Sequence, residues 1–485
     1  MSSDQVCFRT RRGRLSTIGV FAVCVAAGYV AGCKGAEIKF TADKMNISAG
    51  GCDKAIITAE VRIDNKVRSG KTVNFETTAG SFSAVEELTR TVGTTDSEGR
   101  VSVELFSKEA VGTATVTADF YDGTYSAEKS ITVNFVPPTG RFLPVSDSLS
   151  LVCDSENIGA LRPGRPKIVV PCHFSARTAA GCPLPLSAFM GVEGIAHLKA
   201  EAGSLYVERD YWTGELKLFH STHGGPSDPV DVDPVEGEPS RAGPLGQTFN
   251  PRDGVVTLLV AVRAREAFDD LNGNGEYDPG EPFDDIGEPF LDVDDDGVYT
   301  PGIDPWYHDT NGDGQYTGPN GTYDATTYAA ASFKMVWSGV LDEHGDTSRL
   351  ELSGSEDIPN GGSLTVSAHI MDAFMNPVAG FSANSDYVEF DVSGYVNVNP
   401  PWGRRPMTNT TALAFDSRGR YLMYDSEALI YRVTLSDDDP GRTYDPPVGW
   451  SMSVTIHASP GKDQDGYFQN QDQMMFERTL QGTSQ

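Results

Sequence analysis

The chain has 485 residues and a formal net charge of −30, with 68 Asp and Glu against 38 Lys and Arg. Such a surface repels nucleic acid and anionic lipid headgroups, so we expect neither as a partner. Hydrophobic residues make up 39% of the chain, which is enough for packed cores in about three domains of ordinary size.

The N-terminus has the pattern of an export signal. Four arginines between Arg9 and Arg14 precede an apolar run over residues 15–31, which ends in Val30-Ala31-Gly32-Cys33. A basic segment, an apolar segment and small residues at a cleavage site are typical of a secretory signal rather than of a spanning helix, although an uncleaved anchor is the alternative. The last four residues resemble the lipobox of bacterial lipoproteins. This resemblance implies a signal peptide over residues 1–32, a lipid on Cys33 and, because Lys34 follows, the outer membrane of a Gram-negative cell.

Residues 36–136 have the pattern of a β-sandwich. Stretches such as Val101-Ser-Val-Glu-Leu105 alternate apolar and polar residues, and clusters of Gly, Asp and Ser separate them. This alternation indicates antiparallel strands with one buried face. At Ala79–Phe82, Thr94–Gly99 and Gly112–Ala118 the segment resembles bacterial Ig-like domains of the invasin/intimin group. The resemblance implies an Ig-like fold and a role at the cell surface, without implying any chemistry.

Pro137-Pro138 marks a boundary, because consecutive prolines cannot pair in a sheet ladder. Similar strand and turn patterns follow, which predict a second Ig-like β-sandwich over residues 140–340. Residues 329–337 are expected to form its closing strand. An acidic stretch precedes that strand, and we expect its residues 266–325 to be an insertion between the last two strands. The alternative is a calcium-bound linker between two separate sandwiches.

Residues 266–333 contain 17 Asp and Glu and no Lys or Arg. Oxygen-bearing side chains occupy positions 1, 3, 5, 9 and 12 of a twelve-residue loop that starts at Asp270, and the carbonyl of Glu276 supplies position 7. Gly275 stands at position 6, where such a loop turns sharply. The side chains at the five positions are those of Asp270, Asn272, Asn274, Asp278 and Glu281.

Two partial copies of the loop follow, with Asp292, Asp294 and Asp296 in the second and Asp309, Asn311 and Asp313 in the third. Each copy has a tyrosine at position 8, namely Tyr277, Tyr299 and Tyr316. Position 12 is Ile303 in the second copy and Asn320 in the third, so the first loop, which alone has a glutamate there, is expected to dominate binding.

The three loops resemble EF-hand and dockerin-type calcium loops and thrombospondin type 3 repeats. Pro279, Pro301 and Pro319 stand where an exiting helix would begin, so we expect no flanking helix pair. The prediction is one to three structural Ca²⁺ ions rather than a calcium sensor. The alternative is a solvated acidic linker without bound ions.

Ser363–Asp372 with the following Asn376-Pro377-Val378 resembles a strand and turn of the same Ig-like group. We therefore predict a third Ig-like β-sandwich over residues 345–458, closed by Trp450–Ile456. Residues 459–485 are polar and rich in Gln and Asp, and are expected to be a loose tail. The fold class expected for the whole chain is all-β, with tandem Ig-like sandwiches and an irregular insertion.

Seven cysteines are present, of which two lie in the signal peptide and Cys33 is the lipid site. The other four, in an exported chain, predict two disulfides with three possible pairings. The short spacing between Cys172 and Cys182 makes a small closed loop one of these. The only close histidine pair, His220 and His223, is expected to lie in a surface loop. The four remaining cysteines are Cys52, Cys153, Cys172 and Cys182.

No nucleophile elbow, phosphate loop or dinucleotide fingerprint occurs, so we expect no enzyme activity. The sequence predicts a membrane-anchored, surface-exposed or periplasm-facing lipoprotein. Its expected role is adhesion or envelope structure, with an unknown protein or glycan ligand. The alternative is a carbohydrate-binding or hydrolytic accessory protein of the cell envelope.

Overall fold

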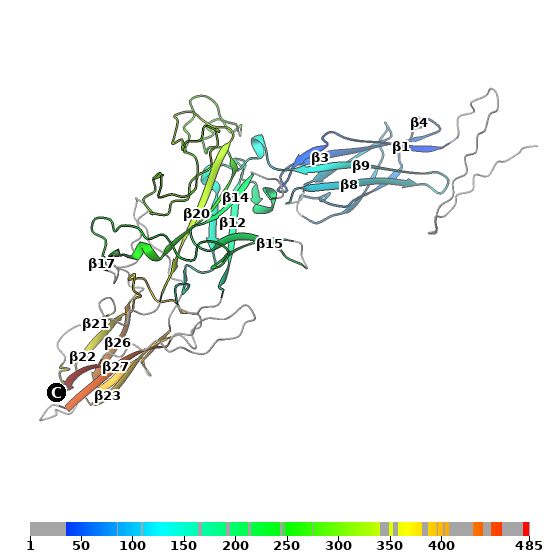
Figure 1. Cartoon of the computed structure of the whole chain (residues 1–485). Helices are drawn as coiled ribbons and strands as arrows, with labels where there is room; N and C mark the ends of the chain where they lie inside the picture. The colour runs from blue at the N-terminus through cyan, green and yellow to red at the C-terminus, as the bar shows by residue number, and fades with distance from the viewer. Residues whose placement is uncertain are drawn as a thin grey trace, which may run out of the picture.

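Figure 1 shows the computed structural model of the chain, in which three β-sandwiches follow one another in an elongated, bent row. Among the described residues there are β-strands and four short 3-10 helices, so the prediction of an all-β chain of tandem Ig-like sandwiches is confirmed. No helix in the described part of the chain is long and apolar enough to cross a membrane. Residues 1–34, with the predicted signal peptide and Cys33, lie outside the described residues. The structure describes residues 35–84, 86–107, 110–162, 167–190, 195–211, 215–242, 246, 248–274, 276–339, 349–352, 357–380, 387–394, 396–400, 403–406, 430–439, 448–457 and 479–484.

The first sandwich has the strand order of an Ig-like domain. In one sheet β3 pairs with β1, β4 and β7, and in the other the order is β2-β9-β8-β5-β6, with β2 parallel to β9. Side chains alternate between the core and solvent, as in β5, where Val73 and Phe75 are buried. The strands are β1 (Ala36–Ala42), β2 (Asn46–Ser48), β3 (Lys54–Ile63), β4 (Lys66–Val67), β5 (Thr72–Thr77), β6 (Arg90–Thr94), β7 (Arg100–Phe106), β8 (Gly112–Tyr121) and β9 (Ser126–Val136).

The second sandwich repeats this arrangement. One sheet has the order β10-β12-β16-β15 with β13 beside β12, and the other has the order β11-β20-β19-β14. β19 and β20 pair along their whole length, so the acidic stretch connects two neighbouring strands of one sheet. The strands are β10 (Ser150–Cys153), β11 (Asn157–Ile158), β12 (Val169–Arg177), β13 (Pro183–Pro185), β14 (Ala196–Ala200), β15 (Ser204–Arg209), β16 (Leu216–Ser221), β19 (Val255–Ala264) and β20 (Thr327–Trp337).

Short elements fill the loops of the second sandwich. β17 (Arg241–Ala242) and β18 (Thr248–Phe249) form a small hairpin that precedes the buried 3-10 helix η4 (Pro251–Gly254). The other 3-10 helices are η1 (Gly140–Phe142), η2 (Ser146–Ser148) and η3 (Leu186–Ala188).

The third sandwich extends further along the chain than predicted. Its last strand is β28, which pairs antiparallel with β27, so the expected end at residue 458 and the expected tail over residues 459–485 are wrong for residues 479–484. β28 is polar, and its pairing needs only backbone groups, so its sequence carries no apolar alternation. The two sheets have the orders β21-β22-β26-β24 and β25-β23-β27-β28. The strands are β21 (Arg349–Leu352), β22 (Ser363–His369), β23 (Tyr387–Gly394), β24 (Val396–Asn399), β25 (Arg404–Pro406), β26 (Ile430–Asp437), β27 (Val448–His457) and β28 (Thr479–Ser484).

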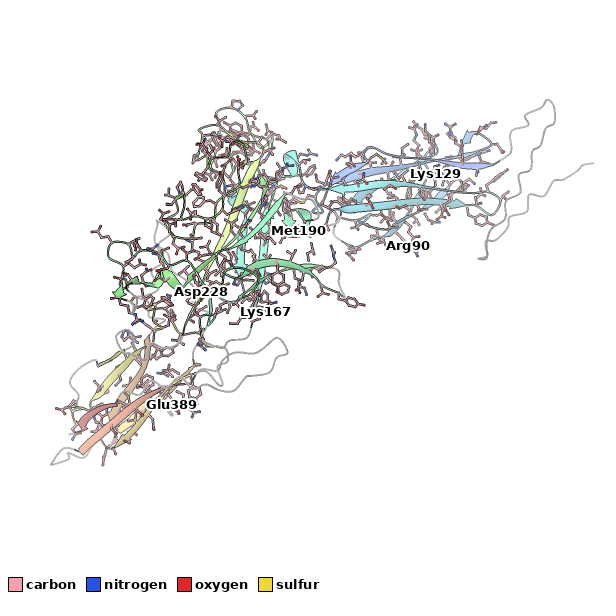
Figure 2. All side chains as sticks on the ribbon, viewed as in Figure 1. Arg90, Lys129, Lys167, Met190, Asp228 and Glu389 are labelled. Carbon is pink, nitrogen blue, oxygen red and sulfur yellow. A yellow bond between two sulfur atoms is a disulfide. The ribbon has the colours of Figure 1, made fainter. Side chains whose placement is uncertain are left out.

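Covalent and buried contacts join the three sandwiches. A disulfide between Cys52 and Cys182 links the first to the second. The second and third meet where Asn157 Nδ2 donates to Pro377 O at 2.7 Å and Ala379 N donates to Ser338 Oγ at 3.1 Å. Figure 2 labels Met190 at the end of the second sandwich near the first, and Asp228 near the third.

The prediction of two disulfides is confirmed, their pairing is settled, and the expected place of His220 is wrong. The second disulfide joins Cys153 and Cys172 across the β10–β12 pair, so Cys172 and Cys182 do not form a small loop. His220 is not in a surface loop, because it lies on β16 with no exposed surface and its ring is 5.7 Å from that of Trp337. Burial lowers the pKa of His220 to about 4. Only His223 of this pair is exposed.

Candidate metal centre

The acidic stretch folds back over the second sandwich. Nine of the ten residues of β19 are buried, although only one face of this strand looks into the sandwich core. On its other face Leu259 and Ala261 form a separate apolar cluster with Leu291 and Val293 of the acidic stretch. A sheet face covered in this way supports the loops above it from a rigid base.

A second contact lies further along the same stretch. The rings of His308 and Tyr328 are 3.8 Å apart, and the rings of His308 and His197 are 4.5 Å apart. Lys199 Nζ lies 5.0 Å from the ring centre of Trp306. His197 and Lys199 belong to β14 and Tyr328 to β20, so these contacts attach the stretch to the sheet on both sides of β19.

Loop 1, residues 270–281, has the turn geometry that the sequence predicts. Asp270 Oδ1 accepts hydrogen bonds from the backbone N–H of Gly273 at 2.7 Å and of Asn274 at 3.1 Å. Asp278 Oδ2 accepts from the side-chain amides of Asn272 and Asn274, at 2.5 and 2.7 Å. The side chains at positions 1, 3, 5 and 9 are thus gathered around the inside of one loop, while Gly275 lies outside the described residues.

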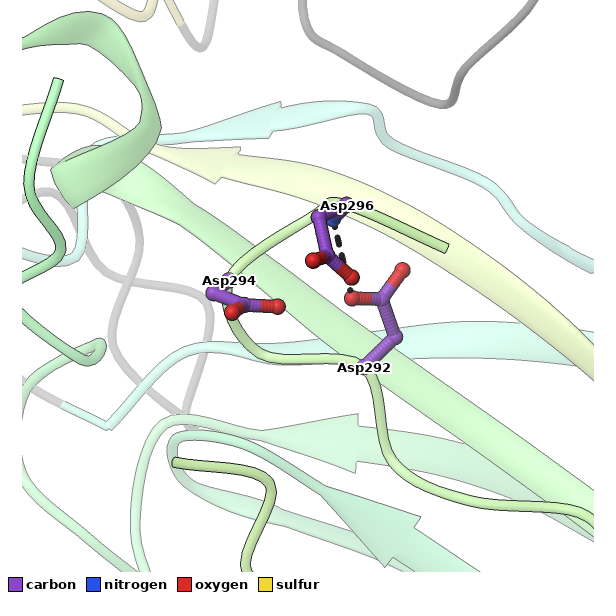
Figure 3. Close-up of side chains that lie close together, drawn as sticks. All are labelled: Asp292, Asp294 and Asp296. Atoms are coloured by element: carbon purple, nitrogen blue, oxygen red, sulfur yellow. Dashed lines mark hydrogen bonds between the residues drawn. The ribbon is translucent and has the colours of Figure 1, made fainter. Parts of the chain in front are cut away.

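Loop 2, residues 292–304, gathers three carboxylates. Asp292, Asp294 and Asp296 each direct one oxygen into a group whose members lie within 4.8 Å of one another (Figure 3). Asp294 Oδ1 is withdrawn from solvent and has no hydrogen-bond partner among the described residues. Burial, together with the charges of Asp296, Asp304 and Asp292, raises the pKa of Asp294 to about 6. A divalent cation would relieve both the repulsion and the missing contact.

Loop 3, which begins at Asp309, repeats the backbone geometry of loop 1. Asp309 Oδ1 accepts from the N–H of Gly312 at 2.6 Å and of Asp313 at 3.1 Å, and its Oδ2 accepts from the N–H of Gly314 at 2.9 Å. Asn311 Oδ1 accepts from the N–H of Asp313 at 2.9 Å. The side chains of Asp309, Asn311 and Asp313 therefore lie together, as the sequence predicts.

A buried carboxylate closes each of these loops. In loop 1 Glu281 Oε1 accepts from the N–H at position 2, Leu271, and Oε2 from the N–H at position 9, Asp278, both at 2.9 Å. In loop 2 Asp304 accepts in the same way from Val293 at 3.0 Å and Thr300 at 2.7 Å.

Loop 3 takes its closing carboxylate from an earlier part of the chain. Glu288 accepts from Thr310 at 2.7 Å and Thr317 at 3.0 Å, which are positions 2 and 9 of that loop. Only loop 1 has an acidic residue at position 12, but Asp304 and Glu288 have the same closing role in loops 2 and 3 from other positions. Asn320, at position 12 of loop 3, does not close that loop, and its backbone N–H donates to Asp285 instead.

The structure contains a fourth loop that the sequence analysis missed. Asp285 accepts from the N–H of Asn320 at 2.9 Å and of Gly321 at 2.5 Å, as Asp309 accepts from Asp313 and Gly314. Glu266 closes this loop by accepting from Ile286 at 2.9 Å and Asp324 at 2.8 Å. Loop 4 is thus assembled from Glu266, Asp285 and residues 320–324, so loop 1 lies between its first two parts in sequence and loops 2 and 3 lie between its last two.

Two sequence repeats signal this arrangement. Asn320-Gly-Thr-Tyr-Asp324 matches Asn274-Gly-Glu-Tyr-Asp278 of loop 1 at four of five positions. A pattern of glutamate, any residue, phenylalanine, any residue and aspartate begins at Glu266, Glu281 and Glu288. The segment Asp304–Asp309 is a fourth copy with one extra residue and Tyr307 in place of phenylalanine. Each copy supplies the closing carboxylate of one loop and the first aspartate of another.

Aromatic side chains pair the four loops. Tyr277 of loop 1 stacks on Tyr323 of loop 4, with ring centres 4.0 Å apart, and Tyr299 of loop 2 stacks on Tyr316 of loop 3 at 4.4 Å. Phe268 and Phe283 pack edge-on around the first pair, and Phe290 and Tyr307 pack around the second. The stretch therefore consists of two similar modules with their own small aromatic cores, and the expected tyrosine at position 8 has a structural role.

The chemistry of this centre is that of hard cations. Its side chains offer carboxylate and amide oxygens, together with backbone carbonyls, and no thiol or imidazole in the loops. Such ligands at flexible geometry suit Ca²⁺ better than the softer transition metals. The candidate ligands are the predicted side chains of the three loops, with Asp285, Asn320 and Asp324 added. Of the predicted set, Glu281 already accepts from two backbone N–H groups and acts by holding the shape of loop 1.

An open cleft lies between the first and second sandwiches. It has a volume of about 970 Å³. Glu86 and Glu87 stand on one wall, and His173, Lys217 and Phe219 stand on the other.

No protein-family model matches the sequence, and no curated protein matches it. In fold, the chain is similar to the crystal structure of invasin, a bacterial integrin-binding protein, at 11% identity and a TM-score of 0.28. That alignment covers 92% of this chain and 60% of the invasin chain, so the chain spans less than two thirds of invasin's length. It is also similar to FdeC, an Escherichia coli adhesin, at 11% identity, with 95% and 99% of the two chains covered and a TM-score of 0.26. The structure of InvD of Yersinia pseudotuberculosis is similar at 11% identity and a TM-score of 0.24, with 92% of this chain and 97% of the InvD chain covered.

Proposed function

We propose that the chain is an exported lipoprotein of the bacterial cell envelope. On this proposal its row of Ig-like domains is stiffened by calcium and acts in adhesion or envelope structure through an unidentified protein or glycan. The observation that carries the proposal is the fourfold loop on the buried face of β19 and β20. It combines 17 acidic residues without a local base, and its geometry suits hard cations.

Two further features support an exported rod. The Cys52–Cys182 and Cys153–Cys172 disulfides persist in oxidising compartments such as the periplasm or the cell surface. Three sandwiches in a row with a covalent link at the first junction make the protein elongated, which suits presentation of a binding surface away from a membrane.

Anchoring is tested by Cys33→Ser in fractionated cells, with Cys24→Ser as the matched control. We expect Cys33→Ser to lose both the acyl label and membrane retention, and Cys24→Ser to keep both, because Val23 before Cys24 does not fit the lipobox. Retention of an unlabelled Cys33→Ser protein in the membrane fraction would reject the lipoprotein.

Calcium binding is tested by equilibrium dialysis of the intact chain against radioactive calcium. We expect up to four bound ions, and the loss of bound calcium in Asp294→Asn and in the Asp270→Ala, Glu281→Ala double variant. Asp391→Asn, which removes an exposed carboxylate on β23 of the third sandwich, should bind as much as the unchanged chain. No saturable binding in any of these proteins would reject the cation sites.

The adhesion role is tested by attachment of intact cells to surfaces coated with protein or glycan. Cells that lack the chain and cells that carry Cys33→Ser should both attach less than cells with the unchanged chain. Equal attachment of all three would leave envelope structure as the role.

Carbohydrate binding is the second candidate, because the cleft between the first two sandwiches brings aromatic and charged side chains together. A glycan array with the exported chain tests it. Binding that is lost in Phe219→Ala and kept in Tyr211→Ala, which removes an exposed aromatic ring outside the cleft, would favour this candidate.

A further inference from the structure

Loop 2 rests on two cations of the second sandwich, the buried Arg252 and the partly buried Lys334. Arg252 Nη1 donates to the backbone oxygen of Asp294. Lys334 Nζ contacts Asp292 Oδ2 at 3.1 Å and also Asp295 Oδ1. Asp295 has a positive φ of 56°, which turns its side chain inward beneath the loop, where it is 2% exposed. The position of loop 2 is therefore tied to Arg252 and Lys334.

The guanidinium of Arg252 is bonded in three directions. Besides its contact with Asp294, Nε donates to Glu238 Oε1 at 3.1 Å and Nη2 donates to Asp233 O at 2.6 Å. The side chains of Arg252 and Glu238 are 3% and 2% exposed. A buried guanidinium that donates from all three of its nitrogens has little freedom to move independently of its partners.

Arg252 belongs to η4, whose other residues touch the third sandwich. Asn376 Nδ2 donates to Pro251 O at 2.8 Å, and a Cβ on Gly254 would come within 2.5 Å of the same nitrogen. Asn250 and Asp253 cap η4 with reciprocal hydrogen bonds, and all four of its residues are buried. A capped and buried turn of four residues moves as one body.

The contacts of Asn376 continue into the junction between the two sandwiches. Its backbone N–H donates to Asp372 Oδ1 at 2.9 Å, and Asp372 Oδ2 accepts from Gly339 N at 2.7 Å. Asn376 and Asp372 have no exposed surface. Arg252 and the rest of η4, followed by Asn376, thus connect loop 2 to the junction.

We infer that cation binding in loop 2 fixes the third sandwich against the second, with Arg252 and η4 as the connection. The inference rests on the proposed cation binding. A cation that orders the Asp294 backbone stabilises the arrangement in which Arg252 is held, and hence the position of Pro251 against Asn376. The coupling is reciprocal, so the docked junction favours cation binding to the same extent.

Hydrogen exchange of the intact chain, with calcium and with chelator, tests the inference. Two segments are followed, residues 292–304 for loop 2 and residues 371–377 for the junction. Chelation should speed exchange in both segments of the unchanged chain, by about fivefold or more at the junction. In Arg252→Gln calcium should still protect loop 2 and no longer affect the junction.

Asn376→Ala breaks the same connection from the third sandwich and should give the same result, which guards against misfolding of the arginine variant. Arg241→Gln is the matched control, because Arg241 Nε donates to Ala373 O at 2.8 Å and thus bonds to the junction without passing through η4. It should speed exchange at the junction and leave its calcium dependence in place.

Protection of loop 2 without any change at the junction would overturn the inference and leave the proposed cation binding intact. A junction response that persists in both Arg252→Gln and Asn376→Ala would also overturn it. The absence of any calcium effect on loop 2 would instead reject the cation binding on which the inference rests.

Discussion

At the scale of single residues, four buried carboxylates define the acidic stretch. Glu266, Glu281, Glu288 and Asp304 each accept two backbone N–H groups from the loop that they close. A buried N–H without an acceptor costs about 1–3 kcal/mol, and each carboxylate satisfies at least two. These residues therefore stabilise the loop shapes, while the aspartates and asparagines inside the loops supply the oxygens of the proposed cation sites.

Glu288→Ala tests which residue closes loop 3. It removes the acceptor for Thr310 and Thr317, so we expect destabilisation on the order of 3 kcal/mol and faster exchange over residues 309–317. Asn320→Ala should leave residues 309–317 unchanged and loosen loop 4. Faster exchange of loop 3 in Asn320→Ala, with no effect of Glu288→Ala, would contradict the closing role of Glu288.

His220 gives the second sandwich a defined pH response. Burial holds its pKa at about 4 in the folded state, against about 6.5 when unfolded. The unfolded chain therefore binds more protons between these values, and the stability present above pH 6.5 is lost as the pH falls toward 4. The loss for this one group is on the order of 3 kcal/mol.

Urea unfolding of the second sandwich between pH 4.5 and 7.5 checks this response. His220→Phe keeps a ring against Trp337 and removes the titration, so its stability should change less with pH than that of the unchanged chain. His223→Phe alters the exposed member of the pair and should keep the full response. If His220→Phe and the unchanged chain lost the same stability between pH 7.5 and 4.5, the pH response would not come from His220.

At the scale of elements, the sequence predicts what depends on local pattern. Alternation in segments such as Val101–Leu105 predicts strands, and the spacing from Asp270 to Glu281 predicts a turn of the observed geometry. Features that join distant residues were not predictable in this way. Loop 4 combines residues on both sides of the other three loops, and β28 pairs with β27 although its sequence has no apolar alternation.

The disulfides illustrate the same limit. Cys52 and Cys182 are 130 residues apart and meet because two sandwiches pack end to end, whereas the spacing of Cys172 and Cys182 suggests a local loop. The prediction that His220 lies in a surface loop is wrong for a different reason. His220 alternates inward on β16, and its polarity alone suggests a surface position.

A non-reducing peptide map tests the junction of the first two sandwiches. It should yield linked peptides for Cys52 with Cys182 and for Cys153 with Cys172, and thiol labelling of the denatured mature chain should find no free cysteine. Cys52→Ser should expose one thiol and destabilise the linked pair by on the order of 5 kcal/mol in the chain-entropy account. A peptide linking Cys172 to Cys182 would contradict this junction.

At the scale of the whole molecule, the acidic stretch is the part whose folding has the least support from the protein alone. Its 17 carboxylates repel one another, and three cations, Lys334, Arg252 and Arg265, form hydrogen bonds with it. The aromatic pairs and the apolar contact with β19 favour compactness, and bound cations would remove the remaining repulsion. The first sandwich has its own strands and core and lies apart from the stretch.

The central claim, that cations fold this stretch, is tested most directly by melting and limited proteolysis of the intact chain in calcium and in chelator. At a hundredfold excess of calcium over its dissociation constant, each independent site adds on the order of 2.7 kcal/mol to the stability of the folded state. We predict that chelation lowers the melting temperature of the second sandwich and opens new cleavage sites within residues 266–325, while residues 36–136 stay protected. Identical melting curves and identical cleavage patterns in calcium and in chelator would contradict the claim.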